Sequence, residues 1–238
     1  MYCGGFNALA LNTGALNTAV GSATLDSNTS GVQNTAIGAN VLTANTIGSN
    51  NTGIGNSSLQ NCTSSSNNTA VGAGSLSSIT TTSGSTALGF NALNALTTGQ
   101  QCVAVGVNAG LSNVTGNSNT ILGHQAMQTG ITGSGNIAIG TFALFNNFGS
   151  NNVCIGTNSG FAITSASNNT AVGTSSLQSN TTGTQNTALG YNTLNAIVTG
   201  SSCTAVGFNA LAVNTGINNT AVGANALDSN TTGTNNMA

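Results

Sequence analysis

The chain of 238 residues contains no lysine, arginine, proline or tryptophan, and charged residues make up only 1% of it. A typical soluble protein carries roughly 25% charged residues, so the surface of this one must be hydrated by amides and hydroxyls. Without cations the chain cannot neutralise phosphates, which excludes nucleic-acid binding. The same absence excludes attraction to an anionic membrane surface through a basic patch.

Long apolar runs are absent as well. The sequence has no run of about 18 apolar residues, so we expect no transmembrane helix. The first six residues lack the positive and apolar regions of a secretory signal. If the protein is exported, we therefore expect a mature piece, or release by another route such as virion assembly and lysis.

A short motif recurs along the whole chain, with the form Asn-Thr-Ala-(Val/Ile/Leu)-Gly. We number positions from its glycine, which is position 0. Ten of the thirteen intervals between these glycines are 17 residues and three are 16. The glycines are Gly5, Gly21, Gly38, Gly55, Gly72, Gly89, Gly106, Gly123, Gly140, Gly156, Gly173, Gly190, Gly207 and Gly223. Low complexity is also typical of disordered chains, but hydrophobic residues reach 38% and fall at fixed positions, which favours a folded repeat array.

Two alternating positions predict a short strand in every repeat. Position −1 is a branched aliphatic residue in all repeats but the first, and position −3 is nearly always Thr, Val or Ile. Side chains alternate along a strand, so positions −3 and −1 share one face, and we expect that face to point into a core. Position −2, mostly alanine, then points away, and we interpret it as a contact surface for another chain. The alternative is that small residues merely fit a tight coil.

Other columns complete a solenoid. Position +4 is mostly leucine and predicts a second apolar ladder, while asparagine recurs at position −4, where stacked amides can hydrogen-bond from repeat to repeat. The glycine at position 0 indicates a corner with positive φ or a close backbone approach. No Asn-Gly or Asp-Gly hairpin signal occurs. We therefore predict an all-β fold, a parallel β-solenoid of about fourteen 17-residue coils that forms a single array over residues 1–238.

These motifs resemble those of a known class of fibres. The segments Asn17–Gly21, Asn169–Gly173 and Asn186–Gly190 resemble the repeats of phage and giant-virus tail-fibre shafts. They are also similar to the head repeats of trimeric autotransporter adhesins. The resemblance covers the whole chain. It implies a parallel β-roll, three chains around an axis, and a spacer or adhesive fibre outside the cell or on the virion surface.

The first and last coils suggest a longer assembly. The segments 6–21 and 208–223 differ at only three of sixteen positions, and Ala238 stops inside the motif. We expect that chains can stack head to tail into an open filament, because an uncapped solenoid end favours pairing.

Residues that could support chemistry are few. His124 and the two acidic residues, Asp26 and Asp228, lie in variable columns, and we interpret them as surface and turn positions. The five cysteines (Cys3, Cys62, Cys102, Cys154 and Cys203) do not share a column on adjacent coils, so we predict no intrachain disulfide. Cys3 and Cys154 replace alanine at position −2, where a buried thiol fits. We predict no catalytic, cofactor-binding or metal-binding residues, and therefore no enzyme.

Three functions remain open. The first is a structural fibre or shaft, made of identical chains. The second is an adhesin that binds a cell-surface glycan, with aromatic residues at position +1 (Phe6, Phe90, Tyr191 and Phe208) as sugar platforms. The competing interpretation is that these rings fill space in the coil or make contacts between chains. The third is an ice-binding solenoid with threonine ladders, which we disfavour here because we expect the threonines at −3 to point inward.

Overall fold

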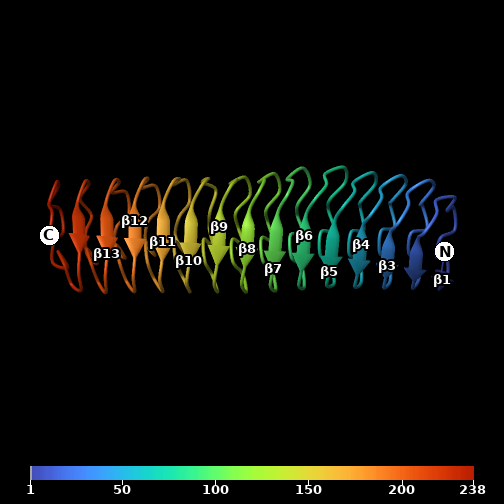
Figure 1. Ribbon diagram of the computed structural model, residues 1–238, viewed down its shortest axis with the longest axis horizontal. Helices are drawn as coiled ribbons and strands as arrows, with labels where there is room; N and C mark the ends of the chain where they lie inside the picture. The colour runs from blue at the N-terminus through green and yellow to red at the C-terminus, as the bar shows by residue number, and fades with distance from the viewer. Residues whose placement is uncertain (1) are drawn as a thin grey trace. The chain divides into compact units, whose positions relative to one another are not determined.

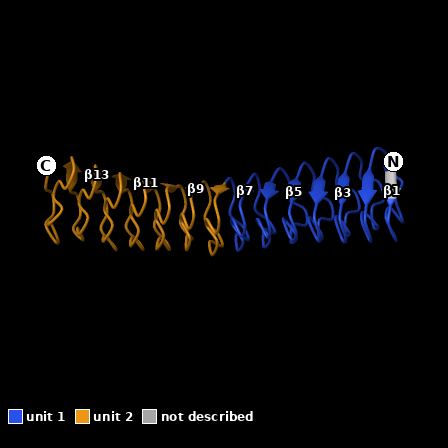
Figure 2. Cartoon of the chain, turned by 90° about the horizontal axis from the view of Figure 1, so that it is seen from below, with its two compact units in different colours: residues 1–118 blue, residues 119–238 orange. Residues whose placement is uncertain are grey.

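The computed structural model describes residues 2–238 of the chain, and side chains from residue 4 onward. It divides into two compact units, unit 1 up to Ser118 and unit 2 from Asn119 to Ala238 (Figure 2). Unit 1 contains seven three-residue strands: β1 (Tyr2–Gly4), β2 (Thr18–Val20), β3 (Thr35–Ile37), β4 (Thr52–Ile54), β5 (Thr69–Val71), β6 (Thr86–Leu88) and β7 (Val103–Val105). Unit 2 contains the next seven: β8 (Thr120–Leu122), β9 (Ile137–Ile139), β10 (Val153–Ile155), β11 (Thr170–Val172), β12 (Thr187–Leu189), β13 (Thr204–Val206) and β14 (Thr220–Val222).

Within each unit every strand pairs in parallel with the next strand along the chain (Figure 1). The register places like positions side by side, as in Thr18 with Thr35 and Ala19 with Ala36. The 16-residue repeats keep the same register, since Thr204 pairs with Thr220. The predicted parallel β-solenoid with a spacing of about 17 residues is confirmed.

Tight corners explain why glycine occupies position 0. These glycines have φ between 118° and 143°, a region that side-chain-bearing residues avoid. A Cβ on Gly72 would also lie 2.4 Å from the carbonyl oxygen of Gly89 in the next coil. Both predicted reasons for glycine, positive φ and close approach, therefore apply at once.

Three further positions of each coil, +2, +4 and −5, adopt the left-handed conformation. Asparagine, which tolerates this region best after glycine, is common at +2 and −5. At +4 the chain instead holds leucines with φ near 50°, such as Leu42 (49°) and Leu93 (50°). Left-handed backbone costs roughly 1–2 kcal/mol per residue, so burial of these leucines must offset a real penalty. The predicted +4 ladder is confirmed, because Leu25, Leu59 and Leu76 are fully buried.

The asparagines at −4 form a buried amide ladder. Asn34 donates from its backbone N to Asn17 Oδ1 at 2.9 Å and from its side-chain Nδ2 to the same oxygen at 3.2 Å. Asn34 Nδ2 also donates to the carbonyl of Gly48 at 2.9 Å, across the interior of the coil. The same bonds recur at Asn136 in unit 2. Stacked amides therefore join successive coils, as the sequence predicts.

The prediction for the strand faces is wrong. The side chains at −2 point into the coil, where Ala19, Ala36 and Ala70 have no exposed surface. The side chains at −3 and −1 point outward instead, so Val20 and Ile37 are exposed and Val71 is half-buried. The reason is space: an interior that already holds the +4 leucine and the −4 amide leaves little room at −2, and alanine fits there. The larger buried residues of this column, Ile121 and Cys154, occur where a neighbouring +4 position is glycine, at Gly110 and Gly160. The alanine column is therefore no contact surface for another chain.

The corner glycine gives a sharp test of the stacking. We expect Gly72→Ala to lower the free energy of unfolding by more than about 3 kcal/mol, because the new Cβ combines a forbidden φ with a clash against backbone. Urea denaturation followed by circular dichroism measures the difference.

Gly84→Asn is the matched control. Gly84 has φ of 79° and only Gln101 Cγ, at 3.8 Å, near its added Cβ. Asparagine occupies the same column at Asn50 and Asn67 with φ near 60°. This substitution should change stability by less than about 0.5 kcal/mol. Equal losses in the two variants would contradict the close-approach account.

Candidate interaction surface

The outward side chains of the strands form a surface that we call the strand face, made of positions −3 and −1. Its −1 column is aliphatic in every strand after β1. Six of its thirteen side chains are exposed, among them Leu122 at 45%, Leu189 at 46% and Val222 at 62%, and the other seven are half-buried. Successive members are neighbours on paired strands, for example Leu189 and Val206. Such rows of exposed apolar side chains on a soluble chain mark interaction sites.

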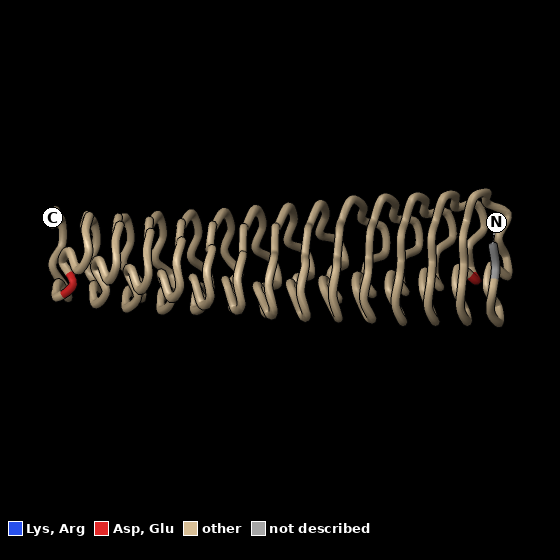
Figure 3. Tube along the Cα trace, turned by 60° about the horizontal axis from the view of Figure 1, so that its bottom comes forward, with Lys and Arg blue, Asp and Glu red and all other residues tan. Residues whose placement is uncertain are grey.

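The −3 column of the strand face is mainly threonine. In unit 1 it holds Thr18, Thr35, Thr52, Thr69 and Thr86 on five consecutive strands, spaced about 4.8 Å apart. The face carries hydroxyls and methyl groups and no charge. Figure 3 shows only two short acidic segments in the whole trace, one in each unit, at Asp26 and Asp228.

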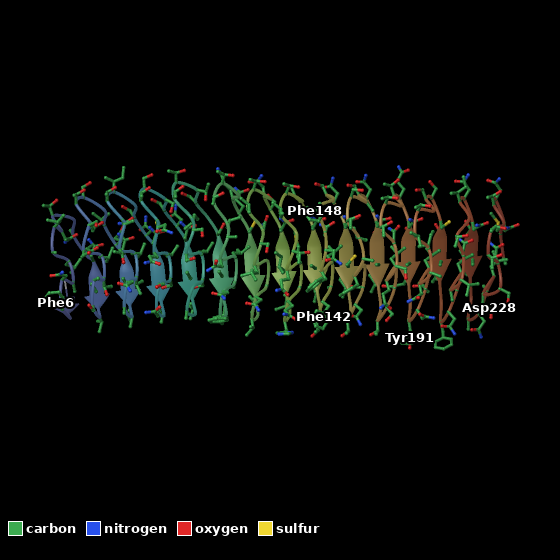
Figure 4. All side chains as sticks on the ribbon, turned by 180° about the vertical axis from the view of Figure 1, so that it is seen from behind. Phe6, Phe142, Phe148, Tyr191 and Asp228 are labelled. Atoms are coloured by element: carbon green, nitrogen blue, oxygen red, sulfur yellow. The ribbon has the colours of Figure 1, made fainter. Side chains whose placement is uncertain are left out.

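Aromatic side chains lie beside the end of the strands. In unit 2, the rings of Tyr191 and Phe208 at position +1 stack with centroids 5.6 Å apart and planes 10° apart, and both are about half exposed. Figure 4 shows Tyr191 and Phe142 along one edge of unit 2 and Phe148 along the opposite edge. A second group of rings, with His124, Phe142, Phe145 and Phe161, lies in the coils of β8–β10.

The histidine and the two aspartates lie far apart from one another along the chain. His124 is exposed at position +1, as predicted, and its ring contacts Phe142. Asp26 accepts a hydrogen bond from Ser27 Oγ at 3.4 Å, and Asp228 accepts one from Ser229 Oγ at 3.1 Å. These bonds agree with the predicted turn role of both carboxylates.

The cysteines are buried thiols. Cys62, Cys102, Cys154 and Cys203 are fully buried, and none of the four is in a disulfide. The side chain of Cys3 lies outside the described part of the structure. Burial raises the pKa of Cys154, and burial is also the main cause of the raised pKa values of Cys62 and Cys203. A thiol that resists ionisation is a poor nucleophile and a poor metal ligand.

Residues 2–238 contain no pocket and no cluster of three or more His, Cys, Asp or Glu side chains that could hold a metal ion. The described chain also has no helix of the length and apolarity needed to cross a membrane. The strand face differs from the other exposed apolar side chains in that its −1 column is aliphatic in every strand after β1.

The comparisons with known proteins add no relative. No family model, no curated protein and no solved structure matches the chain.

Because the pKa of the buried thiol of Cys154 is raised, we predict that the free energy of unfolding decreases at alkaline pH. Because the folded state keeps Cys154 protonated while the unfolded thiol ionises near its ordinary pKa of 9.0, the folded state binds more protons above that pH. We expect stability to be independent of this group below pH 9. Above it, stability should fall by about 1.4 kcal/mol per pH unit for this thiol.

Cys154→Ala is the matched control, because alanine is the usual residue of the −2 column. Urea unfolding from pH 8 to pH 10.5 should show a shallower decline in the variant than in the wild type. A decline of the same steepness in both would mean that ionisation of Cys154 does not contribute.

Proposed function

We propose that the chain is a structural fibre protein, and that identical chains assemble into a rigid shaft through their strand faces. The observation that carries the proposal is the outward aliphatic column at −1, which continues through every strand after β1 and is exposed at six of its thirteen positions and half-buried at the other seven. A monomer gains nothing from a row of branched aliphatics in water, whereas a partner with the same row buries both.

The energetics favour assembly over a lone chain. Unit 1 presents six aliphatic residues in this column and unit 2 presents seven. Covering a partly exposed aliphatic side chain contributes roughly 0.5–1 kcal/mol, so each unit gains about 3–7 kcal/mol before the costs of association. Those costs are about 4–15 kcal/mol for a whole chain, so the full array is needed for stable assembly.

Three chains around a common axis are the arrangement that we propose. Each chain then turns its strip of aliphatic residues toward the axis, and the three strips exclude water together. The resemblance of the repeats to fibre shafts and to trimeric adhesin heads points to the same number. A neutral, threonine-rich and asparagine-rich outer surface fits a shaft that is exposed outside the cell or on a virion.

The assembly can be measured directly. For the 23.0 kDa chain we expect sedimentation equilibrium to give three times that mass. The triple variant Leu122→Thr, Leu189→Thr and Val222→Thr should shift the mass toward that of the single chain. Threonine keeps the β-branched shape that strands favour, so the coil itself should remain folded.

The matched control removes a similar amount of exposed apolar surface from another column of unit 2. Ile131, Phe148 and Val198, at position +8, are exposed by 41%, 42% and 42%, and threonine is the usual residue of that column. The triple change of these residues to threonine should leave the mass unchanged. A monomeric wild type, or equal loss of assembly in both triple variants, would overturn the proposal.

Ice binding is a second candidate, because one observation now favours it. The threonines at −3 point outward, contrary to the sequence-based expectation, so five of them form a regular outward row on unit 1, in which Thr69 is exposed and the other four are half-buried. Evenly spaced hydroxyls and methyl groups on a flat parallel sheet could order water. Assembly through the strand face would bury this row, so the two functions exclude each other on the same surface.

Thermal hysteresis separates the candidates. If the chain binds ice, the wild type should depress the freezing point below the melting point. Thr52→Tyr should then abolish this difference, because it interrupts the row of threonines at −3. If the fibre proposal holds, neither protein should show a gap. Thr215→Tyr, in the +8 column away from the strand face, serves as the control for a bulky substitution.

A further inference from the structure

Three side chains interrupt the threonine column of the strand face, and we call them the register residues: Val103 on β7, Ile137 on β9 and Val153 on β10. Position −3 is threonine in the other ten strands after β1. All three register residues point outward, with Val103 exposed by 41% and Ile137 and Val153 half-buried. Each of their strands therefore presents two aliphatic side chains, at −3 and −1, in place of a threonine and one aliphatic side chain.

The fold of the coil is the same with or without a register residue. The backbone N of Ile137 donates to the carbonyl of Asn152 at 2.8 Å, and the backbone N of Thr35 donates to that of Asn51 at the same distance. Threonine, valine and isoleucine also share the β-branched shape that strands favour. The replacements differ only in the group that faces outward, which is a methyl or ethyl group instead of a hydroxyl. They therefore change what the strand face offers to a partner.

Apart from the register residues, the strand face is nearly the same from coil to coil. Its −1 column is a branched aliphatic residue in every strand after β1, and successive members are spaced about 4.8 Å apart. Two such rows can meet in register, or shifted by one or more coils, with similar contacts. A single arrangement of identical chains therefore requires a feature that breaks this uniformity.

The spacing of the register residues supplies this feature. Counted along the chain, β7 and β9 are two coils apart and β9 and β10 are one coil apart, so the three separations are one, two and three coils. Because these separations all differ, a shift by any number of coils aligns at most one register residue with another. Reversing the direction of one chain aligns at most two. Only parallel chains in register align all three.

A misaligned level is unfavourable for a physical reason. In register, each valine or isoleucine meets its own copy, and each threonine meets a threonine with which it can share a hydrogen bond. After a shift by one coil, Ile137 and Val153 still meet each other, but four other levels bring a threonine hydroxyl against an aliphatic side chain. A hydroxyl buried without a partner is costly, and the facing aliphatic side chain loses an apolar contact. The wrong alignments are therefore penalised.

We propose that Val103, Ile137 and Val153 fix the register and the direction in which identical chains assemble. The proposal rests on the proposed fibre, since it concerns the same strand face, and its partner is a second copy of the chain. The −1 column supplies the attraction between chains, and the register residues select one alignment. We expect aligned chains to outnumber chains shifted by one coil at least about tenfold, which corresponds to about 1.4 kcal/mol.

Disulfide cross-linking between two variants of the full chain measures the register. Val172→Cys and Leu189→Cys each place a thiol at −1, on the paired strands β11 and β12. Both variants also carry Cys3→Ala, the usual residue of that column, so that the remaining native thiols are the four buried ones. A disulfide requires Cα atoms within about 7 Å, and a shift by one coil displaces the chains by about 4.8 Å. Aligned chains therefore cross-link within one variant, whereas chains shifted by one coil join one variant to the other.

The two variants are mixed in denaturant, assembled together and treated with oxidised glutathione, and intact mass spectrometry distinguishes the products. We expect same-variant dimers to exceed mixed dimers at least about tenfold. Adding Val103→Thr, Ile137→Thr and Val153→Thr to both variants should make the two yields comparable while the assembly keeps three chains. Threonine is the usual residue of the column, so this triple change should leave the coil folded.

The matched control replaces the same residue types in another column. Val114, Ile131 and Val198 lie at +8, where threonine is the usual residue. Changing these three to threonine removes two valines and one isoleucine, as the test variant does, but leaves the strand face intact. The excess of same-variant dimers should be preserved.

Comparable yields with the register residues intact overturn the proposal, as does an excess that survives their replacement or is lost in the control. A mass of three chains without any same-variant cross-link overturns it as well, because aligned −1 residues would then lie beyond the reach of a disulfide. Dissociation of the test variant to single chains would show that these residues supply affinity rather than register. In all these cases a wild type of three chains still supports the fibre, whereas a wild type of single-chain mass overturns both proposals.

Discussion

The structure depends on like residues stacking at the distance between paired strands. Each coil lies against the next in parallel register, so the residue at any position meets the residue at the same position of its neighbours. Every interior column must therefore be compatible with itself. Asparagine satisfies this demand, because one amide both donates and accepts along the stack. Alanine and leucine satisfy it by shape alone.

A narrow interior follows from the length of the coil. Seventeen residues that turn at a glycine and at three left-handed positions enclose little volume, and alanine at −2, leucine at +4 and asparagine at −4 fill much of it. A core this thin gives modest stability from apolar burial alone. The amide ladder and the backbone bonds between coils must supply much of the cohesion, and the aliphatic residues at −1 are left outside.

The period, the parallel pairing, the corner glycine and the two ladders at +4 and −4 could all be predicted from the sequence. Each depends on one residue type recurring in one column, which is visible without coordinates. Hydrophobicity alone could not identify which face of the strand points inward. The usual rule that the larger apolar side chain is buried would place Val20 inside and Ala19 outside. The signal that would have corrected it is parity along the strand. Side chains two residues apart on a strand lie on the same face, so positions −4 and −2 share one face while −3 and −1 share the other. A buried amide ladder at Asn17 therefore implies a buried Ala19.

The contacts among the rings of unit 2 were harder to predict than the strand face, since they join columns that look variable. The +1 rings form a column that is visible in the sequence, but Phe142, Phe145 and Phe161 fall in the +2 and +5 columns, and only the coil geometry brings them together. A useful signal was present in Phe142, because an aromatic residue interrupts a column that otherwise suits left-handed backbone.

Self-stacking also decides where a function can reside in such a molecule. An interior substitution disturbs the next coil as well as its own, as the contacts of a Cβ added at the corner glycines show. Cys102 and Cys203 are tolerated in the amide column because their backbone N–H groups still donate to the preceding coil, to Ser85 Oγ and Asn186 Oδ1. Outward columns carry no such restraint, so the strand face can remain uniform for assembly while +1, +2 and +5 vary. A site specific to one coil must then arise as a departure from its column. Phe142 is such a departure, since it is the one aromatic residue in the +2 column of the described coils.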